Sequence, residues 1–283
     1  MLTVVSHALD DDVTPPRING RVAADWLTHF ILDEIRTRRA MNAAVIGLSG
    51  GVDSAVTAYL CARALGPQNV HAFRLPYATS SPSSLDDAQT VADALGIHLR
   101  TIPITGAVDG YLQYEPDADA RRRGNVMART RMLVLFDQSA KLGGLPVGTG
   151  NKTERMLGYF TWHADDTPPI NPLGDLFKTQ VWALARYLGV PAALIDKAPS
   201  ADLEAGQTDE GDLGITYARA DAILRVMLLG YNDAQLVRRG FDPADVAVVR
   251  RRVESTHWKR HLPTTAMLSN TAINEFYLRP VDF

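Results

Sequence analysis

The sequence predicts an α/β protein built on a doubly wound parallel sheet flanked by helices. Apolar runs with strand character alternate with helical stretches between residues 43 and 190, and this alternation is typical of a parallel sheet with both faces covered. Polar segments follow three of the expected strands, at residues 49–54, 77–83 and 149–154. Because such sheets bind ligands beyond the carboxyl ends of their strands, we expect the functional site at these segments.

The expected elements follow one another in a regular order. Residues 1–17 are polar, with a run of aspartates and a pair of prolines, and we expect them to form a loosely held, flexible lead-in. Hydrophobic spacing and glycine or proline stops predict the following order: helix 19–38, strand 43–48, helix 55–65, strand 69–76, helix 84–95, strand 97–102, helix 125–141, strand 145–149, a helix starting at residue 152 and helix 180–188. The remainder is expected to be helical and then irregular. We see no linker, so we expect a single domain over residues 1–283.

Composition excludes several classes of protein. Hydrophobic residues make up 46% and charged residues 22% of the 283 positions, as in ordinary globular proteins. The net charge of -3 argues against a protein that grips nucleic acid through its phosphates, so we expect no nucleic-acid partner. The single cysteine, Cys61, excludes an intrachain disulfide framework and a cysteine-based zinc cluster. No apolar run is long enough to span a bilayer, and the first residues do not resemble a secretion signal. We therefore expect no membrane association and a cytoplasmic location.

The loop after the first expected strand carries the strongest functional signal. Its residues are Gly47, Leu48, Ser49, Gly50, Gly51, Val52, Asp53 and Ser54. Glycines let the backbone approach a ligand, and free N–H groups at the start of the next helix attract an anion. The serine hydroxyls suit phosphate oxygens, whereas the carboxylate of Asp53 fits a phosphate site if it holds a divalent metal ion there. The alternative is an ordinary strand-to-helix corner capped by serine and aspartate. A Walker loop and a dinucleotide fingerprint are both excluded, because their lysine and glycine spacing are absent.

A second loop, Gly148–Glu154, repeats this pattern after the fourth expected strand. Glycines turn the chain and a helix begins, so Glu154 could reach a metal ion held by Asp53. Asn151 and Glu154 also have the spacing of a helix capping pair. The spacing alone leaves both interpretations open.

Arg129 is the most informative cation. In the helix expected from residue 125, it falls inside one apolar arc. The arc consists of Val126, Leu133, Phe136 and Ala140. A buried arginine needs an anion, which here is either a ligand phosphate or carboxylate or a structural acid. We favour the ligand.

Other basic side chains carry weaker signals. Lys178 could offer a point charge to a phosphate group, although a surface lysine is the simpler interpretation. The run Arg121–Arg123 reads as a solvated turn. His71, His98 and His261 show no ligand or dyad spacing, so we expect them to be structural or exposed.

The Ser-Gly-Gly-x-Asp-Ser text of the first loop resembles the pyrophosphate loop of the N-type ATP pyrophosphatases, which adenylate a substrate with ATP. Further segments are similar to those of one family within this group, the NAD synthetases of the ammonia-dependent type. The segments are Gly124–Arg131, Gly148–Glu154, Leu176–Val181 and Pro199–Leu203, the last followed by Gly206–Glu210 and Leu213-Gly214. The similarity extends in order over about residues 20–265.

The resemblance implies an adenine nucleotide alpha hydrolase-like fold and the amidation of deamido-NAD. The nicotinate carboxylate would attack the α-phosphate of ATP, pyrophosphate would leave with Mg²⁺, and ammonia would displace AMP to give NAD. The chain shows no glutaminase domain, so nitrogen is expected to come from free ammonia or from a separate protein. The family is dimeric with a substrate site across the subunit boundary, so a homodimer with Lys259 near that boundary is expected.

Roles of individual residues are carried over by position in the matching motifs. Catalytic roles are implied for Asp53, Asp165 and Lys178, and Mg²⁺ ligation for Asp53 and Glu154. ATP binding is implied for Gly47 to Ser54, Thr149, Lys178 and Ser200. Binding of deamido-NAD is implied for Arg129, Trp162, Trp258 and Lys259.

The sequence departs from the family pattern on the dinucleotide side. Trp162 stands where relatives have a substrate-contacting lysine, Asp165 keeps the carboxylate position, and Pro169 replaces an acidic contact. Trp258 stands in place of a histidine beside the retained Lys259. Two alternatives therefore stay open: another adenylating amidotransferase or ligase of the same superfamily, and a catalytically silent nucleotide-binding paralogue.

Overall fold

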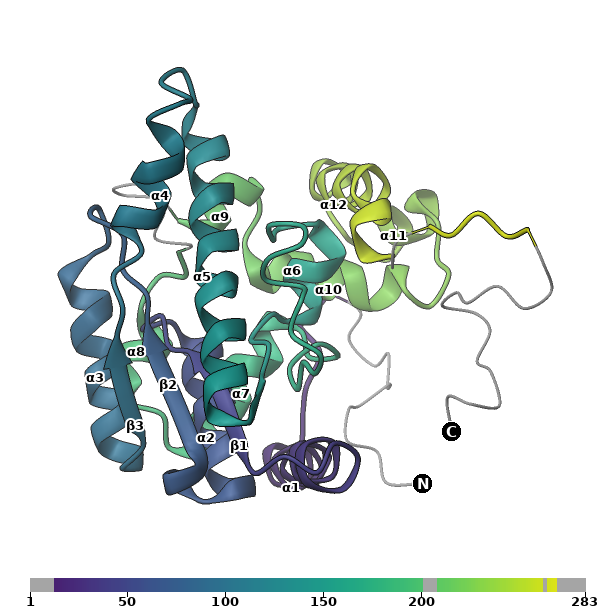
Figure 1. Cartoon of the computed structure of the whole chain (residues 1–283). Coiled ribbons are helices and arrows are strands. Elements are labelled where there is room, and N and C mark those ends of the chain that lie inside the picture. Colours follow the sequence, from purple (N-terminus) through teal and green to yellow (C-terminus); the bar gives the residue numbers. More distant parts are fainter. Residues whose placement is uncertain (1–12, 201–207, 262–263, 269–283) are drawn as a thin grey trace.

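The computed structural model describes residues 13–200, 208–261 and 264–268. Four parallel strands form one sheet in the order β3-β2-β1-β4 (Figure 1). The strands are β1 (Ala43–Gly47), β2 (Val70–Arg74), β3 (His98–Thr101) and β4 (Gly144–Pro146). The predicted doubly wound parallel sheet is confirmed. The lead-in predicted for residues 1–17 falls mostly outside the described residues.

Helices connect and cover the strands. They are α1 (Gly20–Leu32), α2 (Val52–Leu65), α3 (Pro82–Leu95), α4 (Thr105–Leu112), α5 (Ala120–Leu142), α6 (Lys152–Leu157), α7 (Lys178–Leu188), α8 (Ala192–Asp196), α9 (Asp209–Leu213), α10 (Tyr217–Met227), α11 (Asp233–Arg238) and α12 (Pro243–Ser255). Short 3₁₀ turns lie at Pro67–Asn69 and His257–Arg260, and α1 continues into a π-helical turn at Asp33–Thr37. In Figure 1 the C-terminal helices α11 and α12 lie on the side of the molecule opposite α3.

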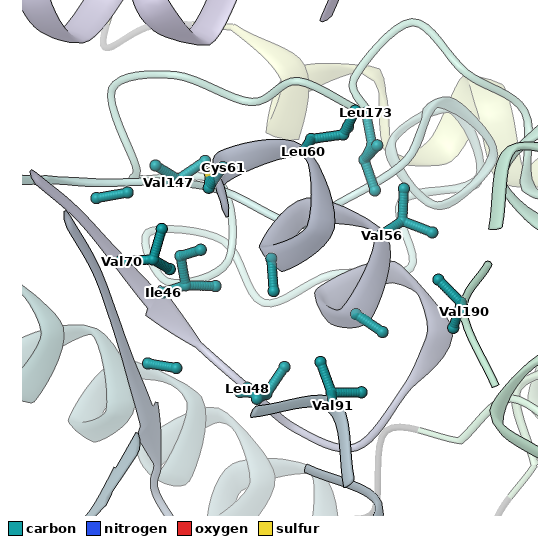
Figure 2. Packing of buried hydrophobic residues seen from close by; sticks show 14 of the residues in the cluster. Ile46, Leu48, Val56, Leu60, Cys61, Val70, Val91, Val147, Leu173 and Val190 are labelled. Atoms are coloured by element: carbon teal, nitrogen blue, oxygen red, sulfur yellow. The ribbon is translucent and has the colours of Figure 1, made fainter. Parts of the chain in front are cut away.

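Strand β1 shows why both faces of the sheet are covered. Successive side chains of a strand point to opposite faces. Ala44 and Ile46 therefore join the apolar cluster shared with α1, α2, α3 and α7, whereas Val45 joins the cluster shared with α4 and α5. Figure 2 shows Ile46 facing α2, with Leu60 and Cys61 among the buried side chains of that helix. The uninterrupted apolar run of β1 follows from this double burial.

Two predictions about α5 are wrong. The helix begins at Ala120, because the Asp119 side chain caps it by accepting a hydrogen bond from the Arg122 N–H (2.7 Å). Arg121–Arg123 therefore form its first helical turn rather than a loop before it, although Arg121 and Arg122 are exposed to solvent as predicted. Most of the apolar arc around Arg129 faces outward: Leu133, Phe136 and Ala140 are exposed, whereas Val126 packs against the cluster that contains Val45. Instead, the sheet side of the helix buries Gly124, Met127, Ala128, Leu135 and Gln138.

The helix carries two apolar stripes, and periodicity does not reveal which one meets the sheet. Leu133 and Phe136 of the outward stripe remain 68% and 42% exposed.

The C-terminal helices build a separate apolar cluster beside the sheet. Leu157 of α6, Phe177 and the buried face of α10 pack there with residues of α9, α11 and α12. Tyr217 and Leu224 of α10 are among its fully buried members. No helix in the described part of the chain is long and apolar enough to cross a membrane.

Strand order places the expected site. β2 and β3 lie on one side of β1, and β4 lies on the other. The loops that leave β1 and β4 therefore diverge at the point where the strand order reverses, which is where doubly wound sheets bind ligands. These are the loops that carry Asp53 and Glu154.

Candidate active site

The first loop has a backbone shape that requires glycine. Gly50 has a φ of +81°, and a Cβ atom there would lie 2.3 Å from the Ser84 carbonyl oxygen. The loop is also held by its own hydroxyls: Ser54 Oγ donates to the Gly51 carbonyl (2.9 Å) and lies 3.1 Å from Ser49 Oγ. Helix α2 starts at Val52 without a side-chain cap on its first N–H groups. Those N–H groups are suited to an anion, and the alternative of a capped corner is not favoured.

Asn151 joins the second loop to the first. Its side-chain oxygen accepts from the Glu154 N–H (3.0 Å), and Glu154 Oε2 accepts from the Asn151 N–H (3.1 Å), so the capping interpretation is correct. The Asn151 Nδ2 group also donates to Asp53 Oδ1 (2.9 Å). Asn151 is fully buried. The cap therefore belongs to the site, because Asn151 binds both carboxylates, that of Asp53 through its side-chain amide and that of Glu154 through its backbone N–H. The sequence prediction did not give Asn151 this role.

Lys178 lies between the two carboxylates rather than on the surface. Its Nζ pairs with Asp53 Oδ2 and lies 3.3 Å from Glu154 Oε1, and its side chain is 3% exposed. Burial acts to lower the pKa of Lys178, but Asp53 and Glu154 outweigh burial and raise that pKa above its ordinary value. Burial raises the pKa of Glu154, against the opposing effect of Lys178. Lys178 is therefore a permanent cation in a cluster of acids.

Two further residues of this cluster carried no predicted role. Tyr217 lies under Lys178, with Nζ 5.2 Å from the ring centre, and its hydroxyl donates to Asp209 Oδ2 (3.0 Å). Asp209 Oδ1 is buried and has no hydrogen-bond partner among the described residues. Burial raises the pKa of Asp209. Asp209 lies inside a matching motif, which could have indicated it, whereas Tyr217 gave no signal in the sequence.

The oxygen atoms that this cluster could offer as metal ligands suit a magnesium ion that is bound together with phosphates. Carboxylate oxygens of Asp53 and Glu154 converge on one ammonium group. Mg²⁺ prefers such hard oxygen ligands and is held by one or two carboxylates plus substrate phosphates. No group of three or more acidic, histidine or cysteine side chains suited to a metal ion occurs among residues 13–200, 208–261 and 264–268.

The residues predicted to bind deamido-NAD lie together in a second cluster around the loop that follows α6. Arg129 is exposed, which corrects the prediction that it is buried, and it donates to the Trp162 carbonyl (3.1 Å). Trp162 meets Trp258 edge to face, with ring centres 5.2 Å apart. Lys259 donates to the carbonyls of Gly158 (2.7 Å) and Phe160.

The remaining predicted residues lie at the margins of these clusters. Asp165 Oδ2 accepts from the Thr161 N–H (2.9 Å), in the same loop as Trp162. Thr149 is half-buried at the exit of β4, and Ser200 is exposed. The Pro199 carbonyl next to Ser200 accepts from the Asp209 N–H (2.9 Å), so this segment is attached to the acidic cluster.

His71 and His98 lie outside both clusters, whereas the ring of His163 packs against Trp162 in the second cluster, with ring centres 3.9 Å apart. His71 and His98 stack across β2 and β3, with ring centres 5.1 Å apart.

The sequence model of the family described as NAD synthase matches residues 24–263. The chain belongs to the NAD synthase family. The NH(3)-dependent NAD(+) synthetase of Trichlorobacter lovleyi is 49% identical to it over 258 residues, which cover 91% of this chain and 94% of the relative. The protein of the same description from Chlorobaculum parvum is 51% identical over 245 residues, or 86% of this chain and 88% of the relative. The predicted resemblance to ammonia-dependent NAD synthetases is confirmed.

The structure of this chain is also similar to solved structures of synthetases. The NH3-dependent NAD synthetase of Campylobacter jejuni has a TM-score of 0.76 and 30% identity, and the match covers 88% of this chain and 100% of that chain. The NMN synthetase of Francisella tularensis has a TM-score of 0.78 and 31% identity, with 88% and 99% coverage. The expected fold class is thereby confirmed.

Proposed function

We propose that this protein makes NAD from deamido-NAD, ATP and ammonia, releasing AMP and pyrophosphate. The observation that carries the proposal is the meeting of Asp53, Glu154 and Lys178 at the point where the strand order reverses. Two acids and a buried cation beside an uncapped helix start form a site for a polyphosphate and its metal ion. The ammonia-dependent synthetases that match nearly the whole chain support the choice of reaction.

The reaction needs two displacements. A nicotinate carboxylate oxygen attacks the α-phosphorus of ATP, the bond between the α-phosphorus and the bridging oxygen breaks, and pyrophosphate leaves. Ammonia then attacks the carbonyl carbon of the mixed anhydride, AMP leaves, and the nitrogen loses a proton. The first displacement places negative charge on the departing pyrophosphate.

Residues of the cluster around Asp53, Glu154 and Lys178, which we call the ATP half of the site, would stabilise that charge. The N–H groups at the start of α2, within the loop from Gly47 to Ser54, and the ammonium of Lys178 would donate to phosphate oxygens. Bound at Asp53 and Glu154, Mg²⁺ would supply further positive charge to the leaving group. Thr149 and Ser200 lie beside this half and would bind the nucleotide.

The second cluster would bind deamido-NAD. The exposed guanidinium of Arg129 suits a dinucleotide phosphate, and the paired rings of Trp162 and Trp258 suit stacking on a base. Lys259 shapes this cluster through the backbone carbonyls that it binds. Asp165, a carboxylate of the Trp162 loop, would take up the proton released from ammonia.

A homodimer and a cytoplasmic location are part of the proposal. The outward stripe of α5, with Leu133 and Phe136 exposed, supports a surface that a second copy covers. Sedimentation of the wild type should give a dimer mass, and Leu133→Lys should give a monomer at the same concentration. The single cysteine is in keeping with a reducing compartment.

The deciding assay uses purified protein with ATP, Mg²⁺, ammonium and deamido-NAD. NAD, AMP and pyrophosphate should form in equal amounts, and Asp53→Ala should abolish their formation. Nicotinic acid mononucleotide is a second substrate to test, because one similar structure is an NMN synthetase. Faster turnover of the mononucleotide would reassign the substrate. If pyrophosphate is released with another carboxylate but not with deamido-NAD or nicotinic acid mononucleotide, the protein is a different ligase of the superfamily. If it binds ATP but releases no pyrophosphate with any of these acids, it is a catalytically silent paralogue.

A further inference from the structure

Asp221 of α10 is a fully buried carboxylate that had no predicted role. Its Oδ1 accepts a hydrogen bond from the Thr153 hydroxyl (2.5 Å). Its Oδ2 accepts from the N–H and the hydroxyl of Thr179 (2.8 and 2.7 Å). A carboxylate away from water needs such donors. The bonds therefore account for an ionisable group in the middle of an apolar helix face.

Both partners lie in the first turn of a helix that presents a site residue. Thr153 precedes Glu154 in α6, and Thr179 follows Lys178 in α7. The first N–H groups of a helix have no partner within it and carry partial positive charge, so a carboxylate stabilises a helix start. Asp221 thus links the two turns from which Glu154 and Lys178 project.

The Thr153 hydroxyl connects the two turns directly. It accepts from the Lys178 N–H (2.9 Å) while it donates to Asp221. A hydroxyl has one proton, and because one side of this oxygen faces a donor, the proton must point to an acceptor. The carboxylate of Asp221 therefore fixes the orientation of the hydroxyl that holds the backbone of Lys178.

We propose that Asp221 is a positioning residue for the reaction. It holds the starts of α6 and α7 together so that Glu154 and Lys178 meet at Asp53. Its hydrogen bonds end at Thr153 and Thr179, so it acts through them and not on substrate. We call the hydrogen bonds that join Asp221, Thr153, Thr179 and the Lys178 N–H the clamp. The consequence of the clamp for turnover rests on the proposed function, whereas the clamp itself rests on these hydrogen bonds. Displacing catalytic groups by about 1 Å costs up to about 100-fold in rate.

Asp221→Asn tests the clamp with little change of shape. Its amide N–H₂ replaces one acceptor with a donor, so the bonds to Thr153 and Thr179 can no longer all form. We expect kcat to fall about tenfold or more, with the KM for deamido-NAD changed less than about threefold, because that substrate binds at the other cluster. Val226→Ala is the matched control, since Val226 is a fully buried residue of the same helix outside the clamp. If both variants lose unfolding free energy equally and also lose kcat equally, the proposal is overturned.

A second pair of variants covers the case in which Asp221→Asn does not fold. Thr153→Ser keeps the hydroxyl and should stay within about threefold of the wild-type kcat, whereas Thr153→Val keeps the shape, lacks the hydroxyl and should lose about tenfold. Equal kcat for these two variants would overturn the proposal.

A readout without substrate separates the clamp from the proposed function. The amides of Lys178 and Thr179 donate to the clamp, so their hydrogen exchange should accelerate in Asp221→Asn or Thr153→Val and not in Val226→Ala. If the wild type makes no NAD, the proposed function fails, and exchange at these amides alone decides the clamp. Unchanged exchange in both clamp variants overturns it.

Discussion

Lys178→Met should lower the free energy of unfolding by about 3 kcal/mol at neutral pH, because it leaves two buried carboxylates without their cation. The Lys178 side chain is 3% exposed, and those of Asp53 and Glu154 are 16% and 18% exposed, so water screens the pair weakly. Methionine keeps most of the apolar stem, so little of the loss comes from packing. The value lies at the lower end of the range for a broken buried pair, about 3–5 kcal/mol, because Glu154 can take up a proton.

The sign of the pH dependence follows from Glu154. Burial already raises its pKa above the ordinary value of 4.5, and removing the neighbouring cation raises that pKa further. A carboxyl group whose pKa is higher in the folded than in the unfolded protein loses stability as the pH rises from the unfolded pKa to the folded one. In the variant this loss continues to higher pH than in the wild type. The difference between the proteins should therefore be smallest in acid and largest in mildly alkaline solution.

Urea denaturation with and without Mg²⁺ measures these differences. Mg²⁺ should restore part of the lost stability of the variant, because it binds the folded carboxylate pair more strongly once the ammonium is gone. Lys152→Met is the matched control, since Lys152 pairs with Asp175, whose side chain is 90% exposed. Such a surface pair contributes less than about 1 kcal/mol. Equal losses in the two variants, with no recovery in Mg²⁺, would refute the reasoning.

Three further predictions concern other parts of the molecule. Gly50→Ala should lower the free energy of unfolding by about 2 kcal/mol or more in urea denaturation, because of its φ of +81° and the approach to Ser84. Gly96→Ala, with a φ of +64° and open space around it, should lose less, and the opposite order would contradict this argument. Trp162→Ala should raise the KM for deamido-NAD about tenfold and leave the KM for ATP within about twofold in steady-state assays; a change confined to ATP would place the tryptophan in the other half of the site. Burial raises the pKa of Asp221 to about 6, so the wild type should lose stability as the pH rises from 4 to 6, and Asp221→Asn should flatten this decline. Parallel curves for the two proteins would show that Asp221 does not titrate there.

The nucleotide half of the site was predictable because its residues are local in sequence. Glycines, hydroxyls and acids directly after β1 and β4 show where the chain turns, and parallel strands bring such turns to one edge. The burial of Lys178 was not predictable in this way. A lysine after a loop reads as a surface residue until tertiary contacts place it between Asp53 and Glu154.

Side chains of α10 and the orientation of α5 depend on packing that no local pattern encodes. Asp221 and Tyr217 belong to α10, far along the chain from Thr153 and Lys178, which they contact. Arg129 was expected in a buried arc, but the sheet takes the other apolar stripe of α5. Hydrophobic spacing shows that a helix has an apolar face, and only the neighbouring elements decide which face is covered.

Helix α6 spans Lys152–Leu157, or about 9 Å at 1.5 Å per residue. Its start carries Glu154, and its end leads into Gly158, whose carbonyl is bound by Lys259 beside the Trp162 loop. A rod this short transmits a displacement from one end to the other with little bending. We therefore expect the nucleotide to change the affinity for the acid substrate, and thermodynamic linkage then requires the acid to change nucleotide affinity by the same factor. Calorimetric titration of each ligand in the presence and absence of the other measures that factor.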